Sequence, residues 1–139
     1  MRLLSMSSTH NADYKCSAVT SPHELNYATV LLLTGPPGSG KSTLLAPLCS
    51  FIRSQGVLCR GWAVDTAAAA MASSHGVADD AASLWQQARH QTKTAAVSWL
   101  ASNGTERACA VVEDMCQLPS LRRIWKHAAR EGACQQARK

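Results

Sequence analysis

The sequence lacks the patterns that mark several common classes of protein. Its six cysteines include no C-x-x-C pair and no cysteine–histidine spacing of a zinc site, and its five histidines are scattered. No apolar run approaches the length of a bilayer span, so we expect no membrane partner. Aromatic residues make up 5%, charged residues 17% and apolar residues 46% of the chain. This composition predicts a globular domain with reduced thiols and gives no reason to expect a structural metal.

The net charge of +5 is concentrated late in the chain. The last turns carry a single acid, Glu131, against six basic residues: Arg122, Arg123, Lys126, Arg130, Arg138 and Lys139. Such a basic tail could meet RNA phosphates. A solvated helix face explains the same charges, and on charge alone we favour that interpretation.

One stretch carries most of the chemistry. The spacing G-x-x-x-x-G-K-[ST] of a phosphate-binding P-loop is present in Gly35, Pro36, Pro37, Gly38, Ser39, Gly40, Lys41, Ser42 and Thr43. The glycines allow successive backbone N–H groups to turn toward one concavity. We expect Lys41 to reach the β- and γ-phosphates of a nucleotide and the Ser42 hydroxyl to ligate Mg²⁺. The predicted cofactors are therefore ATP and Mg²⁺.

The context of this loop supports its assignment. Residues 28–34 are a short apolar run without charge, typical of a strand buried on both faces. After the loop, Leu44, Leu48 and Ile52 recur at helical spacing, and Gly56 suits the end of that helix. A chance match within a Gly/Pro-rich turn would not require this strand–loop–helix order.

Acidic residues follow two further strand patterns. Residues 57–64 predict a strand that ends at Asp65, where we favour a role beside the ligand over the alternative of a helix N-cap. Residues 108–112 predict a buried strand that runs into Glu113 and Asp114. In P-loop enzymes a carboxylate at such a strand end holds Mg²⁺, and we assign that role to Asp114.

Helices are predicted between and after these strands. Residues 84–100 and 119–132 have apolar residues at helical spacing, with Asp80 or Ser83 as possible caps of the first. The alternation of strands and helices predicts an α/β fold, with a P-loop NTPase-type parallel sheet and flanking helices. With only three strands predicted, we expect the N-terminal part of that fold only.

The expected organisation is a disordered arm over residues 1–27 and an incomplete P-loop kinase domain over residues 28–139. The arm is polar and rich in hydroxyl residues, without periodicity. The alternative interpretation of the arm is a transit peptide. Transit peptides are rich in arginine, but Arg2 is the only arginine in the first dozen residues. The default location is therefore the cytoplasm, and the oligomeric state is left open.

With these elements placed, the chain resembles the L-seryl-tRNA(Sec) kinases over about residues 30–133. Besides the P-loop, the similarity lies in residues 56–65, in residues 84–89 and above all in residues 111–130. The chain departs from the family where Glu113 replaces an aspartate and Leu121 a methionine, and the family's C-terminal half has no counterpart.

The resemblance implies an ATP-dependent kinase that phosphorylates the seryl hydroxyl of seryl-tRNA(Sec) in selenocysteine synthesis. Its catalytic residues would be Lys41, Asp65 and Arg122, with Asp65 orienting or deprotonating the acceptor. ATP and an aminoacylated tRNA would be its partners. The alternatives are an ATP-hydrolysing tRNA-modification regulator similar to the elongator-associated ATPases, or a non-catalytic nucleotide-binding fragment.

Overall fold

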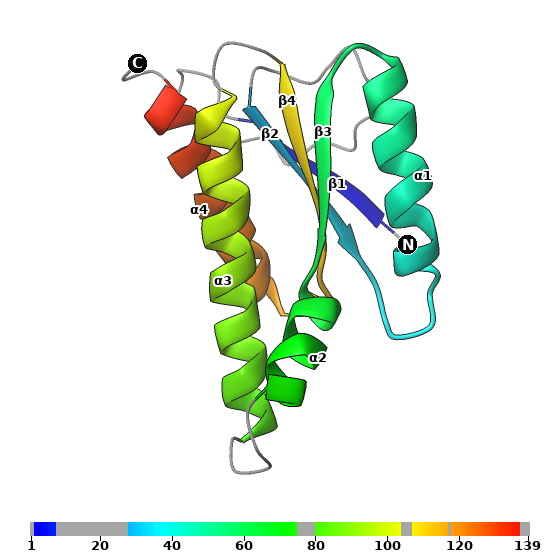
Figure 1. Cartoon of the computed structure of the whole chain (residues 1–139), viewed down its shortest axis with the longest axis vertical. Coiled ribbons are helices and arrows are strands. Elements are labelled where there is room, and N and C mark those ends of the chain that lie inside the picture. The colour runs from blue at the N-terminus through cyan, green and yellow to red at the C-terminus, as the bar shows by residue number, and fades with distance from the viewer. Residues whose placement is uncertain (1, 8–27, 75–79, 104–106, 117, 137–139) are drawn as a thin grey trace.

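A central sheet lies between two layers of helices (Figure 1). The computed structural model describes residues 2–7, 28–74, 80–103, 107–116 and 118–136. Its strands are β1 (Arg2–Ser7), β2 (Ala28–Thr34), β3 (Leu58–Ala63) and β4 (Ala108–Glu113). Its helices are α1 (Lys41–Ser54), α2 (Val64–Ser74), α3 (Ala81–Ser102) and α4 (Pro119–Gln136). The α/β prediction is confirmed.

The sheet has the order β1-β2-β4-β3, and β2, β4 and β3 are parallel. In the register, Glu113 of β4 lies opposite Leu33 of β2 and Ala63 of β3. The three parallel strands therefore end level with one another. Because the P-loop follows β2, this common edge gathers the loop and the residues that follow β3 and β4.

Side chains of successive strand residues point to opposite faces of the sheet. On one face, Cys109 and Val111 of β4 pack with Leu31, Leu33 and the apolar side of α1. On the other face, Ala110 and Val112 pack under α2, α3 and α4. Of the described helices, Figure 1 shows α1 on one side of the sheet and α3 and α4 together on the other.

The structure differs from the expected disordered arm at Arg2–Ser7. These residues form β1, which pairs antiparallel with β2 from Arg2↔Thr34 to Ser7↔Thr29. β1 thus covers the edge of the strand that leads into the P-loop, where unpaired backbone groups would otherwise invite association. The rest of the expected arm, residues 8–27, lies outside the described residues.

The helix boundaries refine the predicted ones. Asp80 caps α3, since its carboxylate accepts a hydrogen bond from the Ala82 N–H at 3.3 Å. The strand expected to end at Asp65 ends at Ala63, and Asp65 lies in the first turn of α2. Among the helices of the described ranges, none is long and apolar enough to cross a bilayer.

Candidate nucleotide-binding site

The loop between β2 and α1 has a backbone that depends on glycine. Gly38 and Gly40 have φ angles of 74° and 80°, in the left-handed region where a side chain causes strain. A Cβ added to Gly35 would lie 2.8 Å from Oγ of Ser39, so a side chain there would displace that serine. The Ser39 N–H donates to the Pro36 carbonyl at 3.3 Å and closes a tight turn.

The start of α1 is built to receive an anion. Gly40 is its N-cap and supplies no side-chain hydrogen bond, and the first turn contains no acid. The first N–H groups and the positive end of the helix dipole therefore remain available to a phosphate. Within the described part of the chain, Oγ of Ser39 is buried without a hydrogen-bond partner. A phosphate oxygen would satisfy it.

Lys41 is only 4% exposed although it carries a charge. Its Nζ donates to the carbonyl oxygen of Pro36 at 3.0 Å, so the side chain folds back across the loop. A buried ammonium group is costly unless it is paired with a negative charge. The lysine thus lies where a phosphate would complete its pairing.

Ser42 and Glu113 form the candidate Mg²⁺ site. The Ser42 hydroxyl donates to Oε1 of Glu113 at 2.7 Å, joining the start of α1 to the end of β4. Glu113 is 1% exposed, and its Oε2 has no hydrogen-bond partner among the described residues. A hydroxyl and a carboxylate oxygen fit Mg²⁺, which typically takes one or two protein carboxylates and fills its other positions with phosphate and water. The described residues contain no cluster of three His, Cys, Asp or Glu that could hold a metal by itself.

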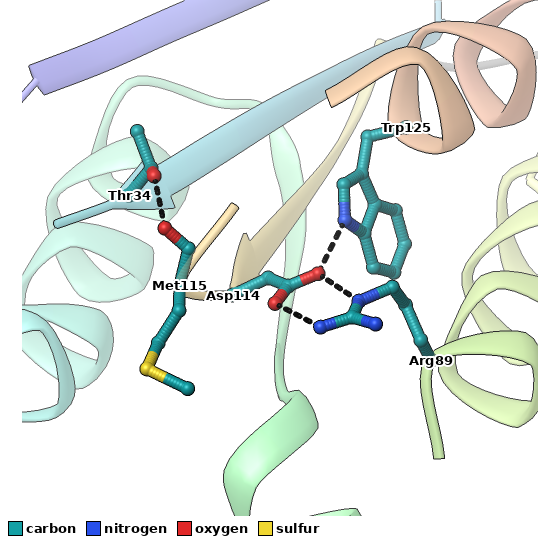
Figure 2. Close-up of polar contacts among 5 residues, drawn as sticks. All are labelled: Thr34, Arg89, Asp114, Met115 and Trp125. Atoms are coloured by element: carbon teal, nitrogen blue, oxygen red, sulfur yellow. Dashed lines mark hydrogen bonds and ion pairs between the residues drawn. The ribbon is translucent and has the colours of Figure 1, made fainter. Parts of the chain in front are cut away.

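Asp114, to which we assigned the metal, faces the other side of the sheet. Its carboxylate accepts hydrogen bonds from Nε and Nη2 of Arg89 at 2.7 and 3.1 Å and from Nε1 of Trp125 at 3.0 Å (Figure 2). Burial alone would raise the pKa of Asp114, but the bonds from Arg89 and Trp125 outweigh it, and the pKa lies below its ordinary value. Both oxygens are therefore engaged away from Ser42.

Two further bonds hold the strand ends together. The Thr34 hydroxyl donates to the Met115 carbonyl at 2.8 Å (Figure 2), and the Asp114 N–H donates to the Leu33 carbonyl at 3.1 Å. Both tie the segment after β4 to the segment that opens the P-loop. The position of Glu113 relative to the loop is thereby fixed by backbone as well as by side chain.

Asp65 and Arg122 lie outside the loop itself. Asp65 is half-buried, and its Oδ1 has no hydrogen-bond partner in the described part of the chain. Its charge is close enough to Arg89 to help raise the pKa of that guanidinium, chiefly raised by the hydrogen bond with Asp114. Arg122 is half-buried in the first turn of α4. Within the described ranges, the structure gives its side chain no hydrogen bond or ion pair.

The sequence analysis did not identify the role of Arg89. The helical spacing of Arg89 indicates that its side chain points inward. Arg89 lies four residues after Trp85 and three before the buried Thr92, so it shares the inward stripe of α3. An arginine at such a position requires an acidic partner.

These features define a P-loop NTPase-type nucleotide-binding domain: a parallel sheet, a glycine loop and the contact between Ser42 and Glu113. A family model described as an AAA domain matches residues 21–134, and the chain belongs to this family. The comparison with curated proteins gives no match, and neither does the comparison with solved structures. The comparisons do not support the finer resemblance to the seryl-tRNA(Sec) kinases.

Proposed function

We propose that the chain binds ATP with Mg²⁺ and transfers the γ-phosphoryl group to a hydroxyl acceptor. The observation that carries this proposal is the partly buried hydrogen bond between Ser42 and Glu113, 2.7 Å long, beside the lysine of a P-loop. It supports the assignment of these two residues as a metal-binding pair next to the phosphate cradle. Oε2 of Glu113 has no hydrogen-bond partner among the described residues, so it would offer that pair an open coordination position.

Phosphoryl transfer requires mainly positioning and charge neutralisation. The loop amides and Nζ of Lys41 would hold the β- and γ-phosphates, with the lysine leaving its contact to Pro36. Mg²⁺, when bound, would neutralise part of the phosphate charge. Glu113 replaces Asp114 in this scheme, because Asp114 is bound to Arg89 and Trp125 on the opposite face.

The acceptor would approach from the side of α2. Asp65 has a buried carboxylate oxygen without a partner in the described region, and it lies in the first turn of the helix that follows β3. Such a group can orient a hydroxyl or take its proton. We propose the seryl hydroxyl of seryl-tRNA(Sec) as acceptor on the resemblance of residues 111–130 alone, with Arg122 near the acceptor.

A second candidate function is ATP hydrolysis without a transfer acceptor. The AAA domain match favours it, because the matched description names a domain and no phosphate acceptor. Asp65 would then orient water in place of a hydroxyl. The two candidates share the nucleotide site and differ in their products.

The test is ATP turnover by the purified chain with and without seryl-tRNA(Sec), followed by analysis of the tRNA-bound amino acid. Phosphoserine on the tRNA would support transfer, and ADP with free phosphate alone would support hydrolysis.

Lys41→Ala should abolish either activity, whereas Lys93→Ala, which removes a surface lysine paired with Glu131, should not. Asp65→Asn should keep ATP binding and lose transfer. Unchanged ATP affinity in Lys41→Ala would contradict the proposed nucleotide site.

A further inference from the structure

Three cysteines from three different elements meet under α1, away from the nucleotide site. Cys49 lies on α1, Cys59 on β3 and Cys109 on β4, and all three belong to the apolar layer between α1 and the sheet. Cys59 and Cys109 are register partners on neighbouring strands, so their side chains leave the same face of the sheet side by side. The Cys59 thiol is close enough to the thiols of Cys109 and Cys49 for both to influence its pKa.

The packing between α1 and β3 is close at this point. A Cβ added to Gly61, two residues beyond Cys59 on the same face, would lie 3.1 Å from Sγ of Cys49. Cys49 is eight residues beyond Lys41, or about 12 Å along the helix at 1.5 Å per residue. The cluster is thus separate from the groups that would touch a nucleotide.

The three thiols differ in access. Cys109 and Cys49 are 0% and 2% exposed, whereas Cys59 is only half-buried and lies on β3, the edge strand of the described sheet. Arg53 keeps its guanidinium nearby, since its Nε donates to the Cys59 carbonyl at 3.1 Å. An oxidant arriving from solvent would therefore meet Cys59 first.

The three thiols also differ in acidity. Hydrogen bonding from Cys109 is the main cause that lowers the pKa of Cys59, helped by Cys49 and by the positive charge of Arg53, against burial. The pKa of Cys109 is raised well above its ordinary value, mainly by the hydrogen bond with Cys59 and by burial. Burial is the main cause that raises the pKa of Cys49 to about 12. A more acidic and more accessible thiol beside two protonated ones is the arrangement of an attacking and a resolving cysteine.

We propose that this cluster is a thiol-modification site in which Cys59 reacts with a small disulfide and Cys109 resolves the product. With glutathione disulfide, Sγ of Cys59 attacks one sulfur and forms a mixed disulfide, releasing one glutathione. Sγ of Cys109 then attacks Sγ of Cys59, forms the Cys59–Cys109 disulfide and releases the second glutathione. The two thiol protons pass to the two glutathione thiolates, so the protein loses two electrons and glutathione disulfide gains them.

Cys109 is the expected partner because of the strand spacing. Neighbouring strands lie roughly 4.7–4.9 Å apart, and the Cα atoms of a disulfide are usually about 4.4–6.8 Å apart. Cys49 comes from the helical layer and is not a register partner of Cys59. It is a buried neighbour of the attacking thiol in the same apolar layer.

The experiment treats the folded full chain with glutathione disulfide and maps its tryptic peptides without reduction. The relevant peptides are residues 42–53 with Cys49, 54–60 with Cys59, and 108–122 with Cys109 and Cys116. We expect one cross-link, between peptides 54–60 and 108–122, with fragmentation placing it on Cys109. A cross-link of 54–60 to 42–53, or to Cys116, would overturn the choice of Cys109.

Two variants test which thiol resolves the mixed disulfide on Cys59. Cys49→Ser should still form the cross-link, whereas Cys109→Ser should stop at a glutathione adduct on Cys59. Circular dichroism checks that each variant is folded. Absence of both cross-link and adduct at Cys59, in a folded chain whose other cysteines react, would overturn the site. These readouts do not depend on ATP turnover, so they stand apart from the proposed function.

Discussion

Glu113 and Asp114 are neighbours in the chain and have opposite surroundings. Glu113 faces α1, contacts Ser42 and keeps one buried oxygen without a partner in the described region. Asp114 faces α3 and α4, and its two oxygens accept three hydrogen bonds from Arg89 and Trp125. The carboxylate of Glu113 can therefore still coordinate a ligand. The carboxylate of Asp114 is already used in bonds that stabilise the fold.

The cause of this difference is the alternation of side chains along β4. Cys109 and Val111 pack toward α1, so Glu113, two residues further, points the same way. Ala110 and Val112 pack toward α3 and α4, which places Asp114 with them. One residue of offset therefore separates a candidate ligand site from a structural ion pair. The comparison can be tested by removing each acid in turn.

The largest expected effect is on stability, in Asp114→Ala. Removing one partner of a buried ion pair leaves Arg89 without its counter-charge, which costs about 3–5 kcal/mol. Glu113→Ala should change the free energy of unfolding by less than about 1 kcal/mol. The substitution loses the bond to Ser42, but it also removes a buried oxygen that has no hydrogen-bond partner among the described residues. Urea unfolding followed by circular dichroism measures both. Equal losses in the two variants would contradict the division between the acids.

The next effect is on ATP turnover, in Glu113→Gln. The amide keeps the shape of the side chain but removes the charge that would hold Mg²⁺, so we expect turnover to fall about 10²–10³-fold, by analogy with loss of one group that stabilises transition-state charge. Steady-state kinetics over a range of Mg²⁺ concentrations should show a higher Mg²⁺ requirement. Full activity in this variant would exclude Glu113 from the metal site.

A smaller effect is expected in the pH dependence of stability. The pKa of Asp114 is lowered in the folded state, so its ionised form stabilises the fold. This contribution is complete above the pKa of an unfolded aspartate, ~3.9, and is lost as the pH falls through the lower folded value. The stability difference between the wild type and Asp114→Asn should therefore shrink as the pH is taken below ~4. A constant difference, measured by urea unfolding at each pH, would contradict this prediction.

The smallest expected effect is that of Trp125→Phe. Trp125 is fully buried and donates to Asp114, and a hydrogen bond to a charged group contributes about 1.5–3 kcal/mol. Trp99→Phe is the matched control, since Trp99 is half-buried and contacts the ring of Trp62 edge to face. Thermal unfolding should show the larger loss for Trp125→Phe. A reversed order would mean that the indole–carboxylate bond adds little.

Local patterns predicted most of the fold. The strand over residues 28–34 is confirmed, and those expected over 57–64 and 108–112 are found within a residue or two. Short apolar runs and the P-loop spacing carry these predictions, because burial on both faces leaves a clear composition. β1 was missed because Arg2–Ser7 is a mixed polar and apolar run whose pairing with β2 depends on distant residues.

The candidate site was harder to predict than the strands. Proximity along the chain does not reveal that Asp114 meets Arg89, 25 residues earlier, or that Ser42 meets Glu113, 71 residues later. Which acid faces the loop depends on which face of the sheet α1 covers. The side chains of β4 alternate between the two faces whichever face α1 covers. The sequence pattern therefore does not indicate whether Glu113 or Asp114 faces the loop.

The central position of β4 has a consequence for the order of folding. β2 and β3 do not pair with each other; each pairs with β4, which begins at Ala108, 80 residues beyond its partner Ala28. The loop that must close is long, and contacts between distant residues slow folding. During synthesis, β1 is the only one of the described strands that can pair with β2 until the chain past residue 108 has emerged. A ribosome-bound chain stalled before that point should therefore be sensitive to protease across residues 28–63.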